Sequence, residues 1–141
     1  MLHWARNGFE LSTDPARMDL DAIHAFISQS YWGQGRSKEV MVRAMHNAIC
    51  FGVFRDGVQV AFARVITDKA VFAYLADVFV HPAWRGQGLS KWILEAVNAH
   101  PDLQEIKRFL LETRDAHGLY AQYGFTKPAN PSIYMERIPT H

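Results

Sequence analysis

The chain alternates between two hydrophobic periodicities, and together they predict a mixed α/β fold. Apolar residues at every second position are typical of strands, whereas apolar residues three to four positions apart are typical of amphipathic helices. Strands are predicted over residues 9–13, 49–54, 58–66, 71–80, 108–113 and 133–138. Helices are predicted over residues 19–29, 37–47, 89–99 and 116–123. This order of elements is typical of a sheet with helices on both faces.

Turn and capping residues support these boundaries. Asp14 or Asp19 is a candidate N-cap for the first helix, and Ser37 is a candidate N-cap for the second. The dipeptide Asp56-Gly57 lies between two predicted strands and is a strong hairpin signal. Pro101 ends the third helix, because the residue before a proline disfavours helical backbone.

Composition limits the classes of protein that the chain can represent. Its 141 residues are 49% hydrophobic, which predicts a single domain over residues 1–141 with one sizeable core. A formal net charge of +1 argues against wide contact with nucleic acid or a membrane surface. We expect no signal peptide and no membrane span. The single cysteine, Cys50, fits a reducing cytoplasm, and its apolar neighbours predict a buried thiol rather than a nucleophile.

A turn with two glycines connects the strand that ends near Val80 to the helix that begins at Leu89. Because Gly86 and Gly88 lack side chains, the backbone N–H groups can approach an anion closely. The N-terminus of the following helix and the guanidinium of Arg85 add positive charge. On its own this pattern equally fits a tight turn. It lacks the third glycine of a Rossmann fingerprint and the Gly-Lys-Ser/Thr of a P-loop.

A second motif, about thirty residues further on, favours the anion-binding interpretation. Arg85-Gly86-Gln87-Gly88-Leu89-Ser90 resembles the Arg/Gln-x-x-Gly-x-Gly/Ala signature of the GCN5-related N-acetyltransferases, the GNAT family. Leu119-Tyr120 followed by Gly124-Phe125 resembles the other hallmark of that family. The resemblance covers nearly the whole chain. It implies a mostly antiparallel central sheet with a splayed parallel pair, and acetyl-CoA as co-substrate.

The resemblance also implies which residues hold acetyl-CoA. Backbone N–H groups of Val78, Phe79 and Val80 correspond to those that bond the acetyl carbonyl and the pantetheine arm. Thr113 stands where relatives often have an asparagine that contacts the pantetheine or a phosphate. The full expected set is Val78, Phe79, Val80, Arg85, Gly86, Gln87, Gly88, Leu89, Ser90 and Thr113.

Tyr120 is the expected catalytic residue. The resemblance assigns it the role of general acid, and a tyrosine with a pKa near 10 can protonate a departing thiolate. The alternative is a packed aromatic ring whose hydroxyl only hydrogen-bonds the co-substrate.

The expected acceptor side consists of Asp77, Tyr31, Trp32 and Arg114. The strand that carries Asp77 resembles that of polyamine acetyltransferases, so its carboxylate could hold a substrate ammonium or serve as a structural acceptor. Tyr31 and Trp32 lie on the loop after the first helix and fit a partly apolar or cationic acceptor. Arg114 could bind a substrate carboxylate or pair with Asp115, itself a candidate N-cap of the fourth helix.

Two roles stay open at this stage. No general base stands out, and deprotonation through water near Asp77 is preferred. The seven histidines are scattered without metal-ligand spacing, so no metal is predicted.

The function predicted from these motifs is acetyl transfer from acetyl-CoA to a primary amine of a small molecule, in the cytoplasm. A non-catalytic module that binds acyl-CoA, or an acetyltransferase of a protein amine, remains an alternative. The apolar last predicted strand, over residues 133–138, leaves a homodimer open.

Overall fold

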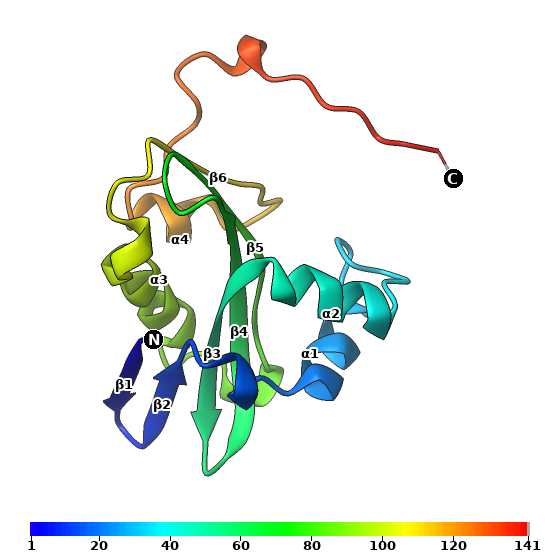
Figure 1. The fold of residues 1–141 in the computed structure, drawn as a ribbon. Helices are drawn as coiled ribbons and strands as arrows, with labels where there is room; N and C mark the ends of the chain where they lie inside the picture. Colours follow the sequence, from blue (N-terminus) through cyan, green and yellow to red (C-terminus); the bar gives the residue numbers. More distant parts are fainter. Residues whose placement is uncertain (141) are drawn as a thin grey trace.

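The computed structural model describes residues 1–140 and is built around one six-stranded sheet (Figure 1). The strands lie in chain order, and every neighbouring pair is antiparallel except β5 and β6, which are parallel. Their bounds are β1 His3–Arg6, β2 Phe9–Ser12, β3 Ala48–Arg55, β4 Val58–Thr67, β5 Phe72–Val80 and β6 Arg108–Leu111. The helices are α1 Leu20–Ile27, α2 Lys38–His46, α3 Leu89–Ala99 and α4 His117–Ala121. The predicted mixed α/β class is confirmed.

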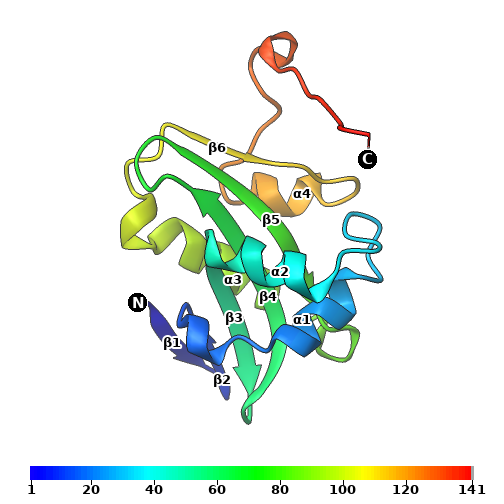
Figure 2. The same ribbon diagram turned by 45° about the vertical axis from the view of Figure 1, so that its right-hand side comes forward.

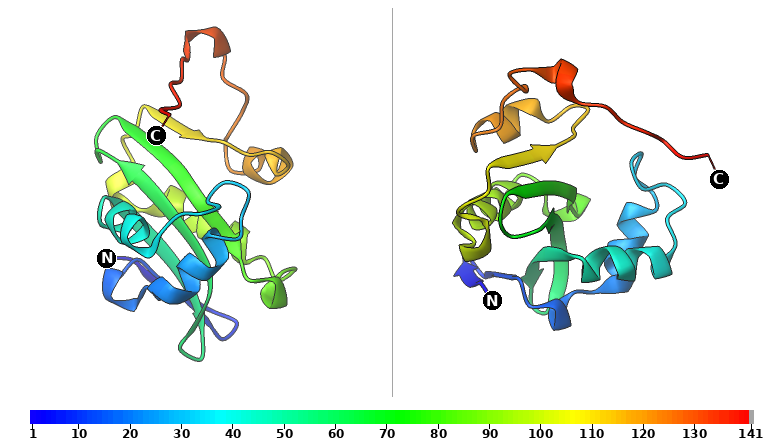
Figure 3. Two further views of the ribbon diagram at one scale, coloured as in Figure 1. Left: turned by 90° about the vertical axis from the view of Figure 1, so that its right-hand side faces the viewer. Right: turned by 45° about the horizontal axis from the view of Figure 1, so that its top comes forward.

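Helices α1 and α2 cover one face of the sheet, and α3 covers the other (Figure 3). Alternation along β4 divides the core between these faces. Ala63 and Val65 belong to the cluster packed on α3, whereas Phe62 belongs to the cluster packed on α1 and α2. The same alternation directs Arg64 toward the α1–α2 side, where its charge meets Asp77.

Local signals read from the sequence act as expected at several boundaries. The Asp19 side chain accepts the Ala22 N–H at the start of α1, and Ser37 accepts the Val40 N–H at the start of α2. Asp14 instead caps a 3-10 turn over Pro15–Arg17. Strand β1 was not predicted, because its side chains are mostly exposed and show no apolar alternation.

Strand β5 contains a bulge at its centre. Phe62 pairs with Phe79 and Arg64 pairs with Ala76, so β5 has one more residue than β4 between these pairs. Asp77 takes up the irregularity with a φ of +55°, in the left-handed region that L-residues seldom adopt. The bulge places the Asp77 carboxylate on the α1–α2 side, although Leu75, two residues earlier, packs on the α3 side.

The parallel pairing of β5 with β6 stops before β5 ends. Its last register pair is Leu75 with Leu111, and β5 continues to Val80 without a neighbour on that side. The two strands therefore separate and leave one backbone edge of β5 open, as the resemblance implies for a splayed pair.

The predicted strand over residues 133–138 is wrong. The structure has a 3-10 turn at Pro131–Ile133, and the segment after it runs away from the sheet without strand pairing (Figures 1 and 2). Alternation alone cannot make a strand, because the backbone groups also need a partner strand. Met135 and Ile138 are accordingly 97% and 76% exposed. No helix within residues 1–140 is long and apolar enough to cross a membrane.

Candidate active site

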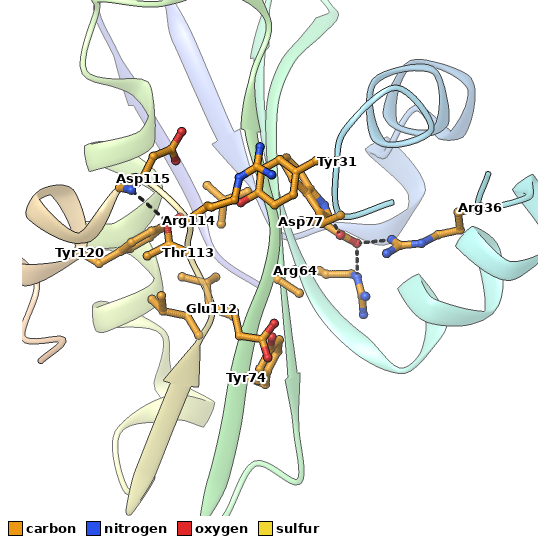
Figure 4. Close-up of a pocket in the computed structure, with 16 residues that line it drawn as sticks. Tyr31, Arg36, Arg64, Tyr74, Asp77, Glu112, Thr113, Arg114, Asp115 and Tyr120 are labelled. Carbon is orange, nitrogen blue, oxygen red and sulfur yellow. Dashed lines mark hydrogen bonds and ion pairs between the residues drawn. The ribbon is translucent and has the colours of Figure 1, made fainter. Parts of the chain in front are cut away.

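A cavity of about 610 Å³ opens where β5 and β6 separate (Figure 4). Its walls come from the loop after α1, the middle of β5, and the segment from β6 to α4. Seven of the predicted site residues lie in these walls: Tyr31, Trp32, Asp77, Val78, Thr113, Arg114 and Tyr120. The predicted catalytic residue and the predicted acceptor side thus share one cavity.

Tyr120 lies on α4, on the β6 side of the cavity (Figure 4). Burial raises the pKa of its hydroxyl above 10, and the neighbouring Tyr31 and Asp115 act in the same direction. The hydroxyl is therefore a donor throughout the neutral range. Its ring packs edge-on against Phe125, with centroids 6.1 Å apart, which brings the two halves of the predicted Tyr–Gly-Phe motif into contact.

Thr113, and not Asp115, supports the start of α4. The Thr113 Oγ1 accepts the backbone N–H of Ala116 at 3.0 Å, and no side chain caps the helix itself. The predicted N-cap at Asp115 is therefore wrong. Thr113 reaches the N–H of Ala116, the residue just before the helix, because β6 ends at Leu111, two residues earlier than predicted, and leaves Glu112 and Thr113 free to turn.

The three predicted backbone donors at the open end of β5, Val78 to Val80, place their side chains on alternate faces of the sheet. Val78 and Val80 both pack against the α3 cluster, and Val78 also lines the cavity. Phe79 points the other way and stacks on Phe26 of α1, with centroids 4.2 Å apart. These packed side chains hold the strand still while its outer backbone edge stays free of β6.

The glycine turn has the backbone that an anion site requires. Gly86 and Gly88 have φ values of +81° and +76°, and a Cβ added at either would meet nothing within 4 Å. Open space over both residues therefore allows a ligand to approach the backbone. Gly88 precedes α3, and no side chain caps that helix, so its first N–H groups remain available as donors. Arg85 donates from Nε to the Val80 carbonyl at 3.2 Å. These features fit the pyrophosphate of a coenzyme A.

Asp77 is enclosed and already neutralised by the protein. Its side chain is 1% exposed. Oδ1 accepts from Trp32 Nε1 at 2.9 Å, while Oδ2 accepts from Arg36 Nη1 at 2.8 Å and from Arg64 Nε at 2.5 Å (Figure 4). Of the two roles predicted for Asp77, ammonium binding and structural acceptor, the geometry favours the second, because the carboxylate has three donors before any ligand arrives.

A second contact joins the two sides of the cavity near the loop after α1. The Arg114 guanidinium stacks on the Tyr31 ring, with its Cζ 3.8 Å from the ring centroid. The Tyr31 ring packs edge-on against Trp32, with ring centroids 5.1 Å apart. Within residues 1–140 Arg114 forms no ion pair with Asp115. Arg114 therefore tethers the α4 side of the cavity to the loop that carries Tyr31 (Figure 4).

From the sequence alone, no role in the site was assigned to Arg64, Tyr74 or Glu112, which the structure brings to this cavity. Burial raises the pKa of Tyr74, and the Glu112 carboxylate beside it raises it further. A single arginine within the otherwise apolar run Val60–Val65 was the available signal for Arg64, because a buried charge needs a partner. Glu112 had no comparable signal, since it was assigned to the interior of a strand.

Other reactive side chains lie away from this chemistry. Cys50 is buried, and burial raises the pKa of its thiol to about 11, so the predicted core thiol is confirmed. His81 accepts the Ala83 N–H in a turn. Among the described residues, no three His, Cys, Asp or Glu side chains come together as a metal site would require.

Comparison with known proteins decides the family. The model of the acetyltransferase (GNAT) domain matches residues 46–127, which include the glycine turn, the open strand and Tyr120. The chain belongs to the GNAT family.

Two relatives are similar over most of this GNAT chain. A GNAT protein of Xanthomonas campestris pv. campestris, described as a putative acetyltransferase, is 52% identical, covers 93% of each chain and superposes with a TM-score of 0.91. The protein named Putative acetyltransferase FG08082, from Gibberella zeae, is 30% identical over 85% of this chain and 80% of its own length.

A more distant structure contains the co-substrate. The predicted acetyltransferase of Clostridium acetobutylicum, solved with acetyl-CoA, is 14% identical, covers 92% of this chain and 94% of its own, and has a TM-score of 0.66. At this identity the likeness concerns the fold alone. It agrees with the GNAT architecture described above.

Proposed function

We propose that this GNAT protein transfers the acetyl group of acetyl-CoA directly to a primary amine of a small molecule. The observation that carries the proposal is the cavity of about 610 Å³, in which Tyr120 lies across from the open edge of β5. A cavity of this size is typical of sites for small ligands. The glycine turn at the far end of β5 supports binding of the coenzyme by its pyrophosphate.

The proposed chemistry needs one proton donor and one proton acceptor. Acetyl-CoA supplies an activated acetyl thioester. The acceptor nitrogen forms a bond to the acetyl carbon as the carbon–sulfur bond breaks, and the Tyr120 hydroxyl gives its proton to the leaving thiolate. Backbone N–H groups from Val78 to Val80 stabilise charge on the carbonyl oxygen. Burial, which raises the pKa of Tyr120, keeps this donor protonated at neutral pH.

Glu112 is the proposed partner of the acceptor's ammonium, in place of Asp77. It lines the cavity and forms no ion pair within the described part of the chain, whereas Asp77 already has two arginines. A carboxylate at this point attracts the ammonium and takes up its proton directly or through water. Asp77 is then a positioning residue, and Tyr31 and Trp32 supply aromatic surface to the acceptor.

The cytoplasm is the proposed location, because a lone buried cysteine suits a reducing compartment. We further propose that the protein forms a homodimer through its exposed C-terminal segment.

Acetyl transfer is tested by following thiol release from acetyl-CoA with a panel of primary amines, and by mass spectrometry of the products. We expect an acceptor mass gain of one acetyl group, with no acetyl group retained on the protein. Coenzyme binding without transfer to any small amine or peptide amine would instead favour the non-catalytic module. Transfer only to peptide N-termini or lysines would replace the small-molecule acceptor by a protein.

A further inference from the structure

The cluster around Asp77 has more positive than negative charge. Arg36 and Arg64 both donate to the same oxygen of Asp77, so one carboxylate faces two guanidinium groups. Within residues 1–140 neither arginine has another carboxylate within ion-pair distance. Glu112 and Asp115 belong to the β6–α4 wall (Figure 4). One positive charge in this cluster is therefore uncompensated by the protein.

The terminal nitrogens of Arg64 are unpaired within residues 1–140, and Arg64 is one of the residues that line the cavity. Only Nε of this guanidinium takes part in a hydrogen bond, so Nη1 and Nη2 have no partner in the part of the chain that the structure describes. No side-chain nitrogen or oxygen in that part is both shut off from solvent and unpaired. Arg64 as a whole is only 9% exposed and lines the cavity, so its terminal nitrogens reach solvent there.

A buried guanidinium with free donors is an unusual arrangement, because desolvated charges are normally paired. Asp77 fixes the Nε edge of Arg64, and the left-handed backbone at Asp77 fixes the carboxylate. The two Nη atoms are thus held in place on the cavity wall. Two parallel N–H donors of this kind match the two oxygens of a carboxylate.

We propose that Arg64, with Arg36 beside it, binds a carboxylate carried by the acceptor, so that the acceptor is an amino acid or another amine with a carboxylate. This inference rests on the proposed acetyl transfer and specifies its substrate class. Glu112 on the opposite wall then meets the ammonium while Arg64 meets the carboxylate. The cavity thereby distinguishes the two ends of a zwitterionic acceptor by charge.

The test compares amines that differ only in the anionic group. The pairs are phenylalanine with 2-phenylethylamine, 4-aminobutyrate with propylamine, and O-phosphoethanolamine with ethanolamine. We expect kcat/KM to favour the carboxylated member of the preferred pair by about 10- to 100-fold, the effect of one charge-assisted hydrogen-bonded pair. In Arg64→Gln this ratio should fall to near one, and Arg64→Lys should keep part of it.

The ratio within one variant is independent of the fraction of protein that is folded, so a destabilised Arg64→Gln still gives an answer. Arg43→Gln, an exposed arginine of α2 outside the cavity, is the control and should keep the wild-type ratio. Equal kcat/KM for the two members of every pair in the wild type, or an unchanged ratio in Arg64→Gln, would overturn the proposal. Preference for the phosphorylated member alone would replace the carboxylate by a phosphate.

A binding measurement separates this inference from the proposed activity. Butyrate and 3-phenylpropionate carry a carboxylate and no amine, and their binding can be followed by intrinsic tryptophan fluorescence, to which Trp32 contributes because its indole contacts Asp77 in the same cluster. Saturable binding that is lost in Arg64→Gln would support the carboxylate site even if no amine were acetylated. Acetyl transfer without any such binding or preference would leave the activity standing and remove the carboxylate site.

Discussion

At the scale of single residues, the acceptor side depends on the backbone of Asp77. A left-handed residue inside a strand costs about 1–3 kcal/mol and persists only where its surroundings hold it. Here three hydrogen bonds to the carboxylate hold it, two of them from arginines. The same strain turns the carboxylate out of the α3 core and fixes the orientation of Arg64, so a costly backbone conformation orients the wall of the cavity.

Tyr120→Phe tests the proposed proton donor. The substitution keeps the ring that packs on Phe125 and removes only the hydroxyl, so folding and coenzyme affinity should change little. We expect kcat to fall by about 10²- to 10⁴-fold, the usual contribution of one acid–base group. Because the loss falls on the chemical step, kcat/KM should fall in parallel. Turnover at saturating acetyl-CoA with a good acceptor measures it.

The matched control is Tyr123→Phe, which removes a hydroxyl on the same segment from a ring that does not line the cavity. It should turn over at the wild-type rate. The acid form of Tyr120 is lost only as pH rises through its raised pKa, so Tyr120→Phe should not alter the shape of the pH–rate profile in the neutral range. If the activity of Tyr120→Phe stays within about threefold of wild type, the loss is far smaller than expected of an acid–base group, and Tyr120 is a packing residue.

Local motifs were readable from the sequence at this scale, and long-range clusters were not. The turn at Gly86 and Gly88 was recognisable because its residues are adjacent in the chain. The Asp77 cluster instead joins Trp32, Arg36 and Arg64, which come from a loop and a different strand. Its formation depends on a bulge whose position no periodicity reveals, which is why the sequence left Asp77 between a substrate role and a structural role and gave Arg64 no role.

At the scale of elements, strands with a buried apolar face were predicted well, and strands without such a face were not. The apolar alternation and the Asp-Gly turn predicted each end of β3 and β4 to within one residue. Helix α3 was predicted with its observed bounds. Strand β1 lacks a buried face, and β6 is shorter than expected because its pairing with β5 ends at Leu111. That early end opens the cavity, so the part of β6 that was predicted wrongly is also the part that creates the site.

Gly88→Glu tests the turn before α3 as the coenzyme site. Its backbone lies at φ +76° with open space above it, so a side chain there would occupy the volume proposed for the pyrophosphate and add negative charge to it. We expect coenzyme A affinity to fall more than tenfold, because one lost charge-assisted hydrogen bond costs about 1.5–3 kcal/mol. Calorimetric titration of the folded variant with coenzyme A measures the change.

Gly57→Glu controls for the backbone. Gly57 has φ +81° and equally open surroundings, but it lies in the hairpin between β3 and β4. Both substitutions should lower stability by a similar amount, roughly 1–2 kcal/mol for an L-residue forced into left-handed backbone. Only Gly88→Glu should lose affinity. Equal affinities in the two variants would remove the turn from the coenzyme site.

At the scale of the whole molecule, two features lack a partner within residues 1–140 of one chain. Strand β6 lies at the end of the strand order and is paired with β5 alone. The C-terminal segment begins beside that strand, where the Arg108 Cζ lies 5.4 Å from the centroid of the Tyr134 ring. It then runs away from the sheet (Figure 1). An unpaired strand edge and an exposed apolar segment complement each other between two copies, and a two-fold axis would satisfy both at once.

The proposed homodimer predicts that substitutions in this segment change the mass of the particle. Met135 and Ile138 are 97% and 76% exposed, and aspartate at both positions would place charge where an apolar interface is expected. We expect size-exclusion chromatography with light scattering to give twice the chain mass for the wild type and one chain mass for Met135→Asp/Ile138→Asp. Val58→Asp, at a 64% exposed residue of the β3–β4 hairpin, should stay dimeric. A monomeric wild type at micromolar concentration, or a double variant that remains dimeric, would show that the segment does not join two copies.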